Sequence, residues 1–134
     1  MSEGKVLVVD DEADVRQSVR MILSKAGYEV VEAEDGEAGV NAIRRGDNPF
    51  ELNAIICDLN MPNMGGMEAI TYFRFHFSHA SVIVLSGEVT SERAGVLLAQ
   101  GVSSILSKPI DQDKLLAAVK KGVRRGGRKA DSAT

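Results

Sequence analysis

The chain has 134 residues, 44% of them hydrophobic and 26% charged, a composition typical of one globular domain. No apolar run approaches the roughly 20 residues of a membrane span, and the first residues lack the apolar segment of a signal peptide. A single cysteine excludes an internal disulfide framework and gives no metal-binding spacing. We therefore expect a cytoplasmic protein that does not contact membranes.

The charge is distributed unevenly along the chain. Residues 1–119 carry ten Lys or Arg and eighteen Asp or Glu, whereas residues 120–134 carry six basic residues and one acid. We predict a domain over residues 1–125, followed by a basic disordered tail or linker stub over residues 126–134. The basic stretch could touch nucleic acid or anionic lipid, but it lacks interleaved aromatic residues and a helix-turn-helix. We therefore expect no direct nucleic-acid binding by this domain.

The first part of the chain alternates between the two kinds of periodicity. The β-branched run 5–9 predicts a strand, and apolar residues at helical spacing predict a helix over 12–26, which Gly27 ends. A second strand is expected over 28–33 and a second helix over 36–45. We predict a loop where Gly46 and Pro49 flank polar residues.

The second part continues the same alternation. A short run too apolar for a surface strand ends at Asp58 and is followed by a turn that contains Pro62, Gly65 and Gly66. The remaining pattern predicts strands over 53–57, 80–85 and 103–107, and helices over 66–78, 90–100 and 112–124. Five strands alternating with five helices predict an α/β fold: a doubly wound, flavodoxin-like parallel sheet in the order 2-1-3-4-5.

Chemically reactive side chains follow four of the predicted strands. Asp10 and Asp11 follow the first strand, Asp58 ends the third, Ser86 ends the fourth and Lys108 ends the fifth. The carboxyl ends of parallel strands meet at one edge of the sheet, and the switch point of this strand order lies between the first and third strands. We therefore expect these five side chains to form one site.

Three neighbouring carboxylates repel one another unless a cation lies among them. Oxygen ligands of this kind suit Mg²⁺, for which Mn²⁺ could substitute. A carboxylate beside the metal can act as a nucleophile that accepts a phosphoryl group, while the metal and Lys108 offset the developing charge. The Ser86 hydroxyl can donate a hydrogen bond to a phosphate oxygen. Taken alone, Asp10 and Asp11 with Glu12 are also typical of an acid-rich helix N-terminus.

The combined pattern resembles the CheY-like receiver domain of two-component response regulators over residues 4–124. It consists of Asp-Asp after the first strand, Asp-x-Asn-Met-Pro after the third, Ser-Gly after the fourth and Lys-Pro after the fifth. The resemblance implies that Asp58 is the phospho-acceptor. It further implies that Asp11 and Asp58 bind Mg²⁺ directly, Asn60 through its backbone carbonyl and Asp10 through a water. Ser86 would supply the switch hydroxyl. Lys108 would pair with the phosphoryl group.

Three further expectations come from the resemblance. The Lys108–Pro109 peptide bond should be cis. The strand-five switch position is Ile105, where the family often has Tyr or Phe, so the aromatic part of the usual switch is missing. Asn60 and Glu88, each two residues beyond a central site residue, match chemotaxis-type regulators and imply a short-lived phosphoryl state.

The expected function is that of a signalling module that accepts a phosphoryl group from a sensor histidine kinase or a phosphotransfer protein. It would assist its own phosphorylation and dephosphorylation without being a turnover enzyme. Partner binding, to an unknown output protein or domain or to a second copy, would change at the face of the predicted helix 90–100, strand 103–107 and helix 112–124.

Other interpretations remain open at this point. The chain could be the receiver portion of a longer DNA-binding or enzymatic response regulator. An aspartyl-phosphate phosphohydrolase of the haloacid-dehalogenase kind would place Asp-x-Asp after its first strand, whereas here the candidate nucleophile follows the third strand and Asn60 stands two residues beyond it. A flavodoxin-type cofactor binder would need aromatic-flanked flavin loops, which the chain lacks.

Overall fold

The computed structural model describes residues 3–61 and 65–132. Its strands are β1 Gly4–Val9, β2 Tyr28–Ala33, β3 Ala54–Asp58, β4 Ser81–Ser86 and β5 Ser104–Ser107. Its helices are α1 Ala13–Lys25, α2 Gly36–Arg44, α3 Asn48–Glu51, α4 Gly66–His76, α5 Ser91–Ala99 and α6 Gln112–Ser132.

The strands form one parallel sheet in the order β2-β1-β3-β4-β5. This confirms the predicted doubly wound, flavodoxin-like arrangement. The order reverses between β1 and β3, so the carboxyl ends of these two neighbouring strands border the crevice in which such folds bind ligands. The topology therefore places the residues after Val9 and the end of β3 side by side.

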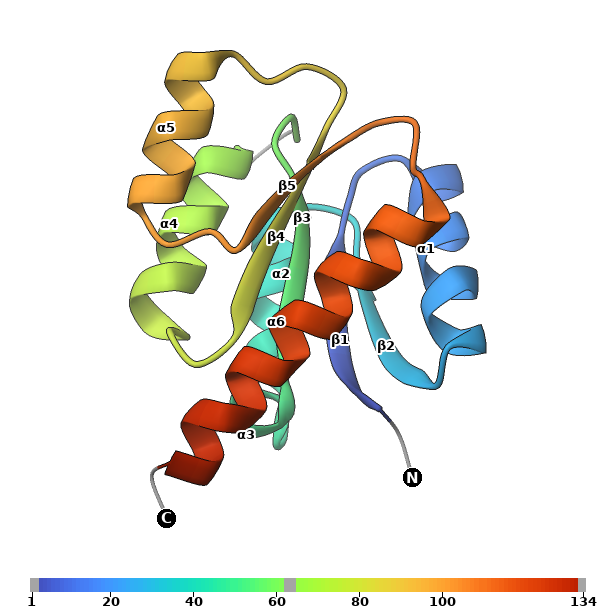
Figure 1. Cartoon of the computed structure of the whole chain (residues 1–134), viewed down its shortest axis with the longest axis vertical. Helices are drawn as coiled ribbons and strands as arrows, with labels where there is room; N and C mark the ends of the chain where they lie inside the picture. Colours follow the sequence, from blue (N-terminus) through green and yellow to red (C-terminus); the bar gives the residue numbers. More distant parts are fainter. Residues whose placement is uncertain (1–2, 62–64, 133–134) are drawn as a thin grey trace.

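The sheet separates two apolar cores because successive side chains of a strand point to opposite faces. Leu7, Val9 and Cys57 belong to the core shared with α2, α4 and α5. Val6 and Ile56 belong to the core shared with α1 and α6. Figure 1 shows α6 crossing in front of the sheet, α1 beside β2 and α2 behind the sheet. Each fully buried aliphatic side chain contributes roughly 1.5–3 kcal/mol, which makes the sheet a rigid support for its carboxyl edge.

The bounds of all five strands agree with the prediction to within one residue. The segment predicted as a loop differs, because Asn48–Glu51 forms the short helix α3. Proline fits the first turn of a helix, where its missing N–H has no intrahelical partner. Asn48 also donates a side-chain hydrogen bond to Ala42 O at 2.7 Å, which fixes the entry into α3. The Pro62–Met64 part of the predicted turn lies outside the described residues.

The last helix is longer than expected. We predicted that this helix ends near residue 124, which is wrong because α6 continues to Ser132. The disordered segment expected from residue 126 stays a prediction. Lys, Arg and Ala favour the helical conformation, and they outweigh the glycines of this segment. The division into a domain over 1–125 and a functionally separate tail stays a prediction.

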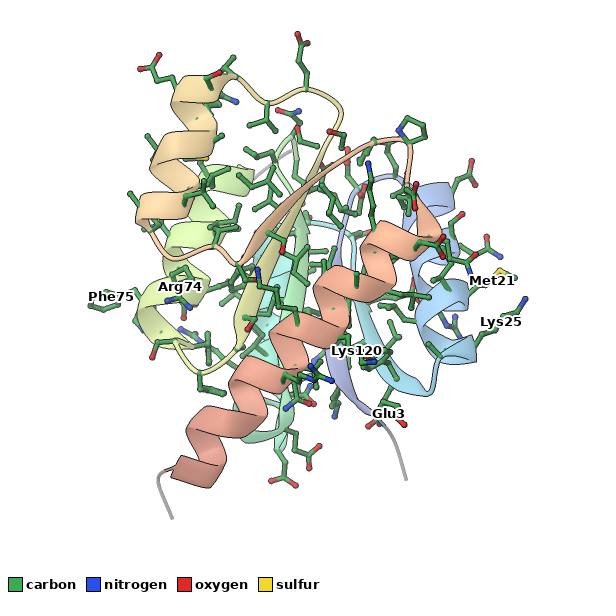
Figure 2. The ribbon with its side chains drawn as sticks, viewed as in Figure 1. Glu3, Met21, Lys25, Arg74, Phe75 and Lys120 are labelled. Carbon is green, nitrogen blue, oxygen red and sulfur yellow. The ribbon has the colours of Figure 1, made fainter. Side chains whose placement is uncertain are left out.

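Several apolar side chains lie outside the two cores. On α4, Phe73 is fully buried, whereas Phe75 is 80% exposed and points away from the protein (Figure 2). Met21 on α1 and Val96 and Leu98 on α5 are also exposed. Within the described residues, no helix is both long enough and apolar enough to cross a membrane.

Candidate functional site

Asp58 is the last residue of β3, whose five residues are all buried. Only 2% of Asp58 is exposed. Its Oδ1 accepts a hydrogen bond from the backbone N–H of Asn60 at 3.2 Å, and its Oδ2 lies 3.3 Å from Lys108 Nζ. The Asp58 carboxylate thus lies at the carboxyl edge of the sheet. The backbone of Asn60 holds its Oδ1, and its Oδ2 lies beside the Lys108 ammonium.

Asp10 follows β1 and is fully buried. Its N–H donates to Ala33 O at 3.1 Å, and its Oδ1 accepts a hydrogen bond from the N–H of Glu12 at 2.8 Å. Its Oδ2 forms an ion pair with Lys108 Nζ at 3.1 Å but has no hydrogen-bond partner among the described residues. The same ammonium lies 3.3 Å from Asp58 Oδ2, so Lys108 stands between these two buried carboxylates.

The carboxylates of Asp10, Asp11, Glu12 and Asp58 form one cluster. An oxygen from each lies within 4.8 Å of the others, and the outer two residues, Asp11 and Glu12, are exposed. Carboxylate oxygens near a water-accessible edge are the ligands that Mg²⁺ prefers. The four clustered carboxylates therefore fit a divalent cation.

Lys108 stands at the end of β5, and its N–H donates to Ser86 O at 2.8 Å. The Lys108–Pro109 peptide bond is cis, as the resemblance implied. Besides Asp10 and Asp58, the ammonium group contacts Glu12 Oε1 at 2.9 Å. Burial lowers the pKa of Lys108, but the three surrounding carboxylates more than offset this and raise it above its ordinary value. The lysine is therefore a permanent cation at the centre of the cluster.

The pKa of Asp58 is raised, first because burial disfavours the charged form and then because Asp10 lies close. The N–H of Asn60 and the Lys108 ammonium act in the opposite direction. Burial, followed by the negative charges of Asp58 and Asp10, also raises the pKa of Cys57. Cys57 is fully buried in the core, and the raised pKa disfavours its thiolate form.

Ser86 ends β4 and is 1% exposed. Its hydroxyl donates to Glu88 O at 3.0 Å and accepts a hydrogen bond from the N–H of Glu88 at 3.3 Å. The hydroxyl thus bonds to its own loop, while the Glu88 side chain is exposed. Leu85, the residue before Ser86, pairs with Asp58 in the sheet, so the two strand ends are neighbours.

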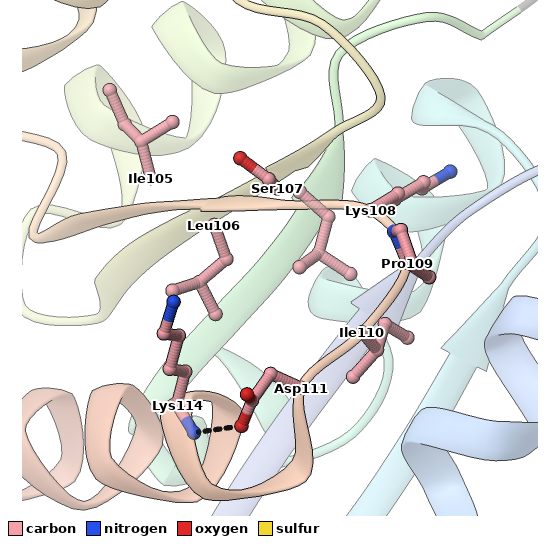
Figure 3. A pocket seen from close by; sticks show the side chains of 9 residues that line it. Ile105, Leu106, Ser107, Lys108, Pro109, Ile110, Asp111 and Lys114 are labelled. Carbon is pink, nitrogen blue, oxygen red and sulfur yellow. Dashed lines mark hydrogen bonds between the residues drawn. The ribbon is translucent and has the colours of Figure 1, made fainter.

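Ile105 lies on β5 and packs against the core shared with α4 and α5. Figure 3 shows it on the opposite side of the strand from Leu106, which packs against the other core. The same view shows side chains that line a pocket, among them Lys108, Pro109 and Asp111. The Asp111 side chain accepts a hydrogen bond from the N–H of Lys114 at 3.1 Å. This bond makes Asp111 the N-cap of α6.

The structure adds two residues to the predicted set. Glu12 contacts Lys108, and Arg16 Nη1 donates a hydrogen bond to the carbonyl oxygen of Asp10 at 2.8 Å. Glu12 directly follows Asp10 and Asp11, and this position in the sequence could have indicated that it belongs to the acid cluster. Nothing in the spacing of Arg16 distinguishes it from an ordinary exposed arginine of an amphipathic helix.

The chain resembles known proteins over most of its length. The family model described as the response regulator receiver domain matches residues 6–120. The sensor kinase/phosphatase CqsS of Vibrio cholerae is 29% identical over 120 residues, covering 87% of this chain and 17% of that protein. The cell cycle transcriptional regulator CtrA of Caulobacter vibrioides is 26% identical over 128 residues, covering 96% of this chain and 54% of the relative.

Two solved structures extend the comparison. A response regulator receiver domain protein from Clostridium thermocellum is 27% identical, with a TM-score of 0.84, and the match covers 91% of this chain and 95% of that one. The chemotaxis protein CheY4 of Vibrio cholerae is 32% identical, with a TM-score of 0.79, and the match covers 88% and 97% of the two chains. Given the family match over residues 6–120 and these likenesses, the chain belongs to the response regulator receiver domain family.

Proposed function

We propose that this chain accepts a phosphoryl group on Asp58 and thereby changes the affinity of one of its faces for a partner. The observation that carries the proposal is the setting of Asp58. It is a buried carboxylate 3.3 Å from a lysine ammonium, within a cluster of four acids at the switch point of the sheet. The donor would be a sensor histidine kinase or a phosphotransfer protein, in line with the family.

The acid cluster is the proposed site of Mg²⁺, with Mn²⁺ as a substitute. Asp11 and Asp58 would bind it directly, Asn60 through its backbone carbonyl and Asp10 through a water. When bound, the ion would neutralise charge on the phosphoryl oxygens. An open cavity beside Asp11 and Asn60, with Arg93 at its rim, offers the donor a path to these residues.

Asp58 would act as the nucleophile. One of its carboxylate oxygens forms the new bond to phosphorus while the bond between phosphorus and the donor's imidazole nitrogen breaks, and that nitrogen keeps the electron pair. The N–H of Asn60 holds Asp58 Oδ1, which orients the carboxylate before the reaction. Lys108 moves its charge from the free carboxylates to the phosphoryl oxygens.

The change would pass to α5 through Ser86. Its hydroxyl now donates to Glu88 O, so a new bond to a phosphoryl oxygen would release that carbonyl in the loop before α5. A single residue of α5, Leu97, is buried, whereas Val96 and Leu98 are exposed. A helix with so small a buried surface can shift at low cost. We therefore propose that the α5-β5-α6 face binds the output protein or domain, or a second copy of the chain.

Two side chains would set the lifetime of the phosphoryl group. Asn60 and Glu88 are both exposed and border the route of the hydrolytic water. In this proposal the chain assists its own phosphorylation and dephosphorylation and is not a turnover enzyme. Its buried free cysteine is compatible with the cytoplasm, where we place it. A receiver that acts alone and one that controls an attached output domain are both consistent with this chemistry.

The intact mass of the protein tests the proposal. The chain is incubated with acetyl phosphate and Mg²⁺, beside Asp58→Ala and a sample treated with a chelator. We expect a gain of one phosphoryl group that requires both Mg²⁺ and Asp58. A gain that persists in Asp58→Ala, or no gain at any Mg²⁺ concentration, would refute the assignment.

A further inference from the structure

The polar groups of Asp10 are almost all fixed by neighbouring residues. The N–H donates to Ala33 O, Oδ1 accepts a hydrogen bond from the N–H of Glu12, and the carbonyl oxygen accepts one from Arg16 Nη1. Only Oδ2 has no hydrogen-bond partner within the described residues, and it forms an ion pair with Lys108 Nζ at 3.1 Å. Arg16 is thus the side chain that completes the support of this buried residue.

The guanidinium group of Arg16 is itself held in place. Its Nε lies 3.3 Å from Glu32 Oε1, and both side chains are partly buried, with 21% and 30% exposed. Glu32 lies on β2 opposite Val8, next to the pair formed by Ala33 and Val9. The backbone N–H of Arg16 donates to Glu12 O at 3.0 Å. One residue of α1 therefore connects the loop after β1 to the neighbouring strand.

The bond to the carbonyl oxygen of Asp10 has a consequence for Asp11. The carbonyl of Asp10 and the N–H of Asp11 belong to the same planar peptide unit. Fixing the oxygen restrains this plane, and with it the position of the Asp11 Cα that carries the side chain. Arg16 thus holds the backbone from which two of the four clustered carboxylates project.

We propose that Arg16, braced by Glu32, is a positioning residue that sets the affinity of the acid cluster for a divalent cation. This inference rests on the metal site of the proposed function and names a residue on which that site depends. Outer residues that orient metal ligands typically change metal affinity by about 10–100-fold when they are removed.

Charge and position predict opposite results for the loss of Arg16. If the guanidinium acted only as a nearby positive charge, its removal would make the cluster more negative and strengthen Mg²⁺ binding. If it positions Asp10 and Asp11, its removal weakens binding. The direction of the change therefore separates the two roles.

The chain offers a matched control in Arg20. Its Nη1 pairs with the other oxygen of Glu32 at 3.2 Å, but the side chain is 60% exposed and has no described contact with Asp10. The rise of the unfolding midpoint with Mg²⁺ concentration gives the dissociation constant for the full chain. We expect at least about a tenfold weaker constant in Arg16→Ala, less than about a twofold change in Arg20→Ala, and partial recovery in Arg16→Lys.

A second readout uses phosphorylation by acetyl phosphate. In Arg16→Ala, the Mg²⁺ concentration for half-maximal rate should rise at least about tenfold, while the rate at saturating Mg²⁺ stays within about twofold of wild type. If Arg16→Ala does not fold, the Mg²⁺ affinities of Arg16→Lys and Glu32→Gln are compared with those of the wild type and Arg20→Ala instead. Unchanged or tighter Mg²⁺ binding in a folded variant overturns the inference alone. Absence of Mg²⁺ binding by the wild type overturns the proposed metal site and the inference with it.

Discussion

Gly66, the first residue of α4, lies against the backbone of Leu59, the residue that follows Asp58. A Cβ built on Gly66 would approach the carbonyl oxygen, carbonyl carbon and Cα of Leu59 to well under the 3.0 Å that real Cβ atoms keep. These are backbone atoms of the residue between Asp58 and Asn60, so no side-chain rotation can relieve the overlap. The N–H of Gly66 also donates to Leu59 O at 3.0 Å.

The cost of Gly66→Ala follows from these contacts. Moving the Leu59 backbone by roughly 1 Å within a packed region costs about 1–3 kcal/mol. A weakened hydrogen bond between Gly66 and Leu59 adds about 0.5–1.5 kcal/mol. The sum is about 1.5–4.5 kcal/mol, a substantial share of the roughly 5–15 kcal/mol that keeps a domain folded. For a chain of this length it corresponds to a Tm lowered by about 5–16 °C.

Gly65→Ala is the matched control. No atom lies within 4 Å of a Cβ built there, and its backbone, with φ −61° and ψ 157°, is ordinary for alanine. The change should cost less than about 1 kcal/mol, the value of a poorer N-cap. Urea unfolding followed by far-UV circular dichroism measures both variants, and acetyl phosphate labelling measures the effect on Asp58. Equal stabilities of Gly66→Ala and Gly65→Ala would show that the backbone contact does not matter.

Three further predictions use other parts of the structure. The folded-state pKa of Asp58 is raised, so its contribution to stability is fully present below the ordinary carboxyl pKa and is lost as the pH rises through the folded value. In metal-free urea titrations at several pH values, Asp58→Asn should lack this loss, and parallel pH profiles for both proteins would contradict it. Cys57 should resist iodoacetamide in the native state and react on unfolding, because burial raises its pKa; labelling at the rate of a free thiol would disprove this. Leu97→Ala should lower the free energy of unfolding by about 2–4 kcal/mol because Leu97 is fully buried. Leu98 is 57% exposed, so Leu98→Ala should lower it by less than about 0.5 kcal/mol. Similar losses in the two variants would mean that other residues hold α5 on the sheet.

The strand order and the gathering of reactive side chains could both be predicted from sequence for the same reason. In a parallel sheet all carboxyl ends lie at one edge, so a polar residue directly after an apolar run has a known position in space. Asp10, Asp58 and Lys108 are each such a residue, and the structure brings the three together. The short helix α3 and the extension of α6 were missed because local propensity there is nearly balanced between helix and loop.

Side-chain pairing could not be predicted in the same way, because several partners compete for each group. Lys108 lies near three carboxylates, and its shortest contact is with Glu12, 96 residues away in the chain, which the pattern of strands and helices does not specify. The Ser86 hydroxyl likewise bonds to its own loop instead of to a neighbouring strand end. Both groups are thus engaged with partners that a phosphoryl group on Asp58 would have to replace. Since each exchange trades one hydrogen bond or ion pair for another, the net change is small compared with either interaction alone. A difference of a few kcal/mol between the two arrangements is what a reversible switch requires.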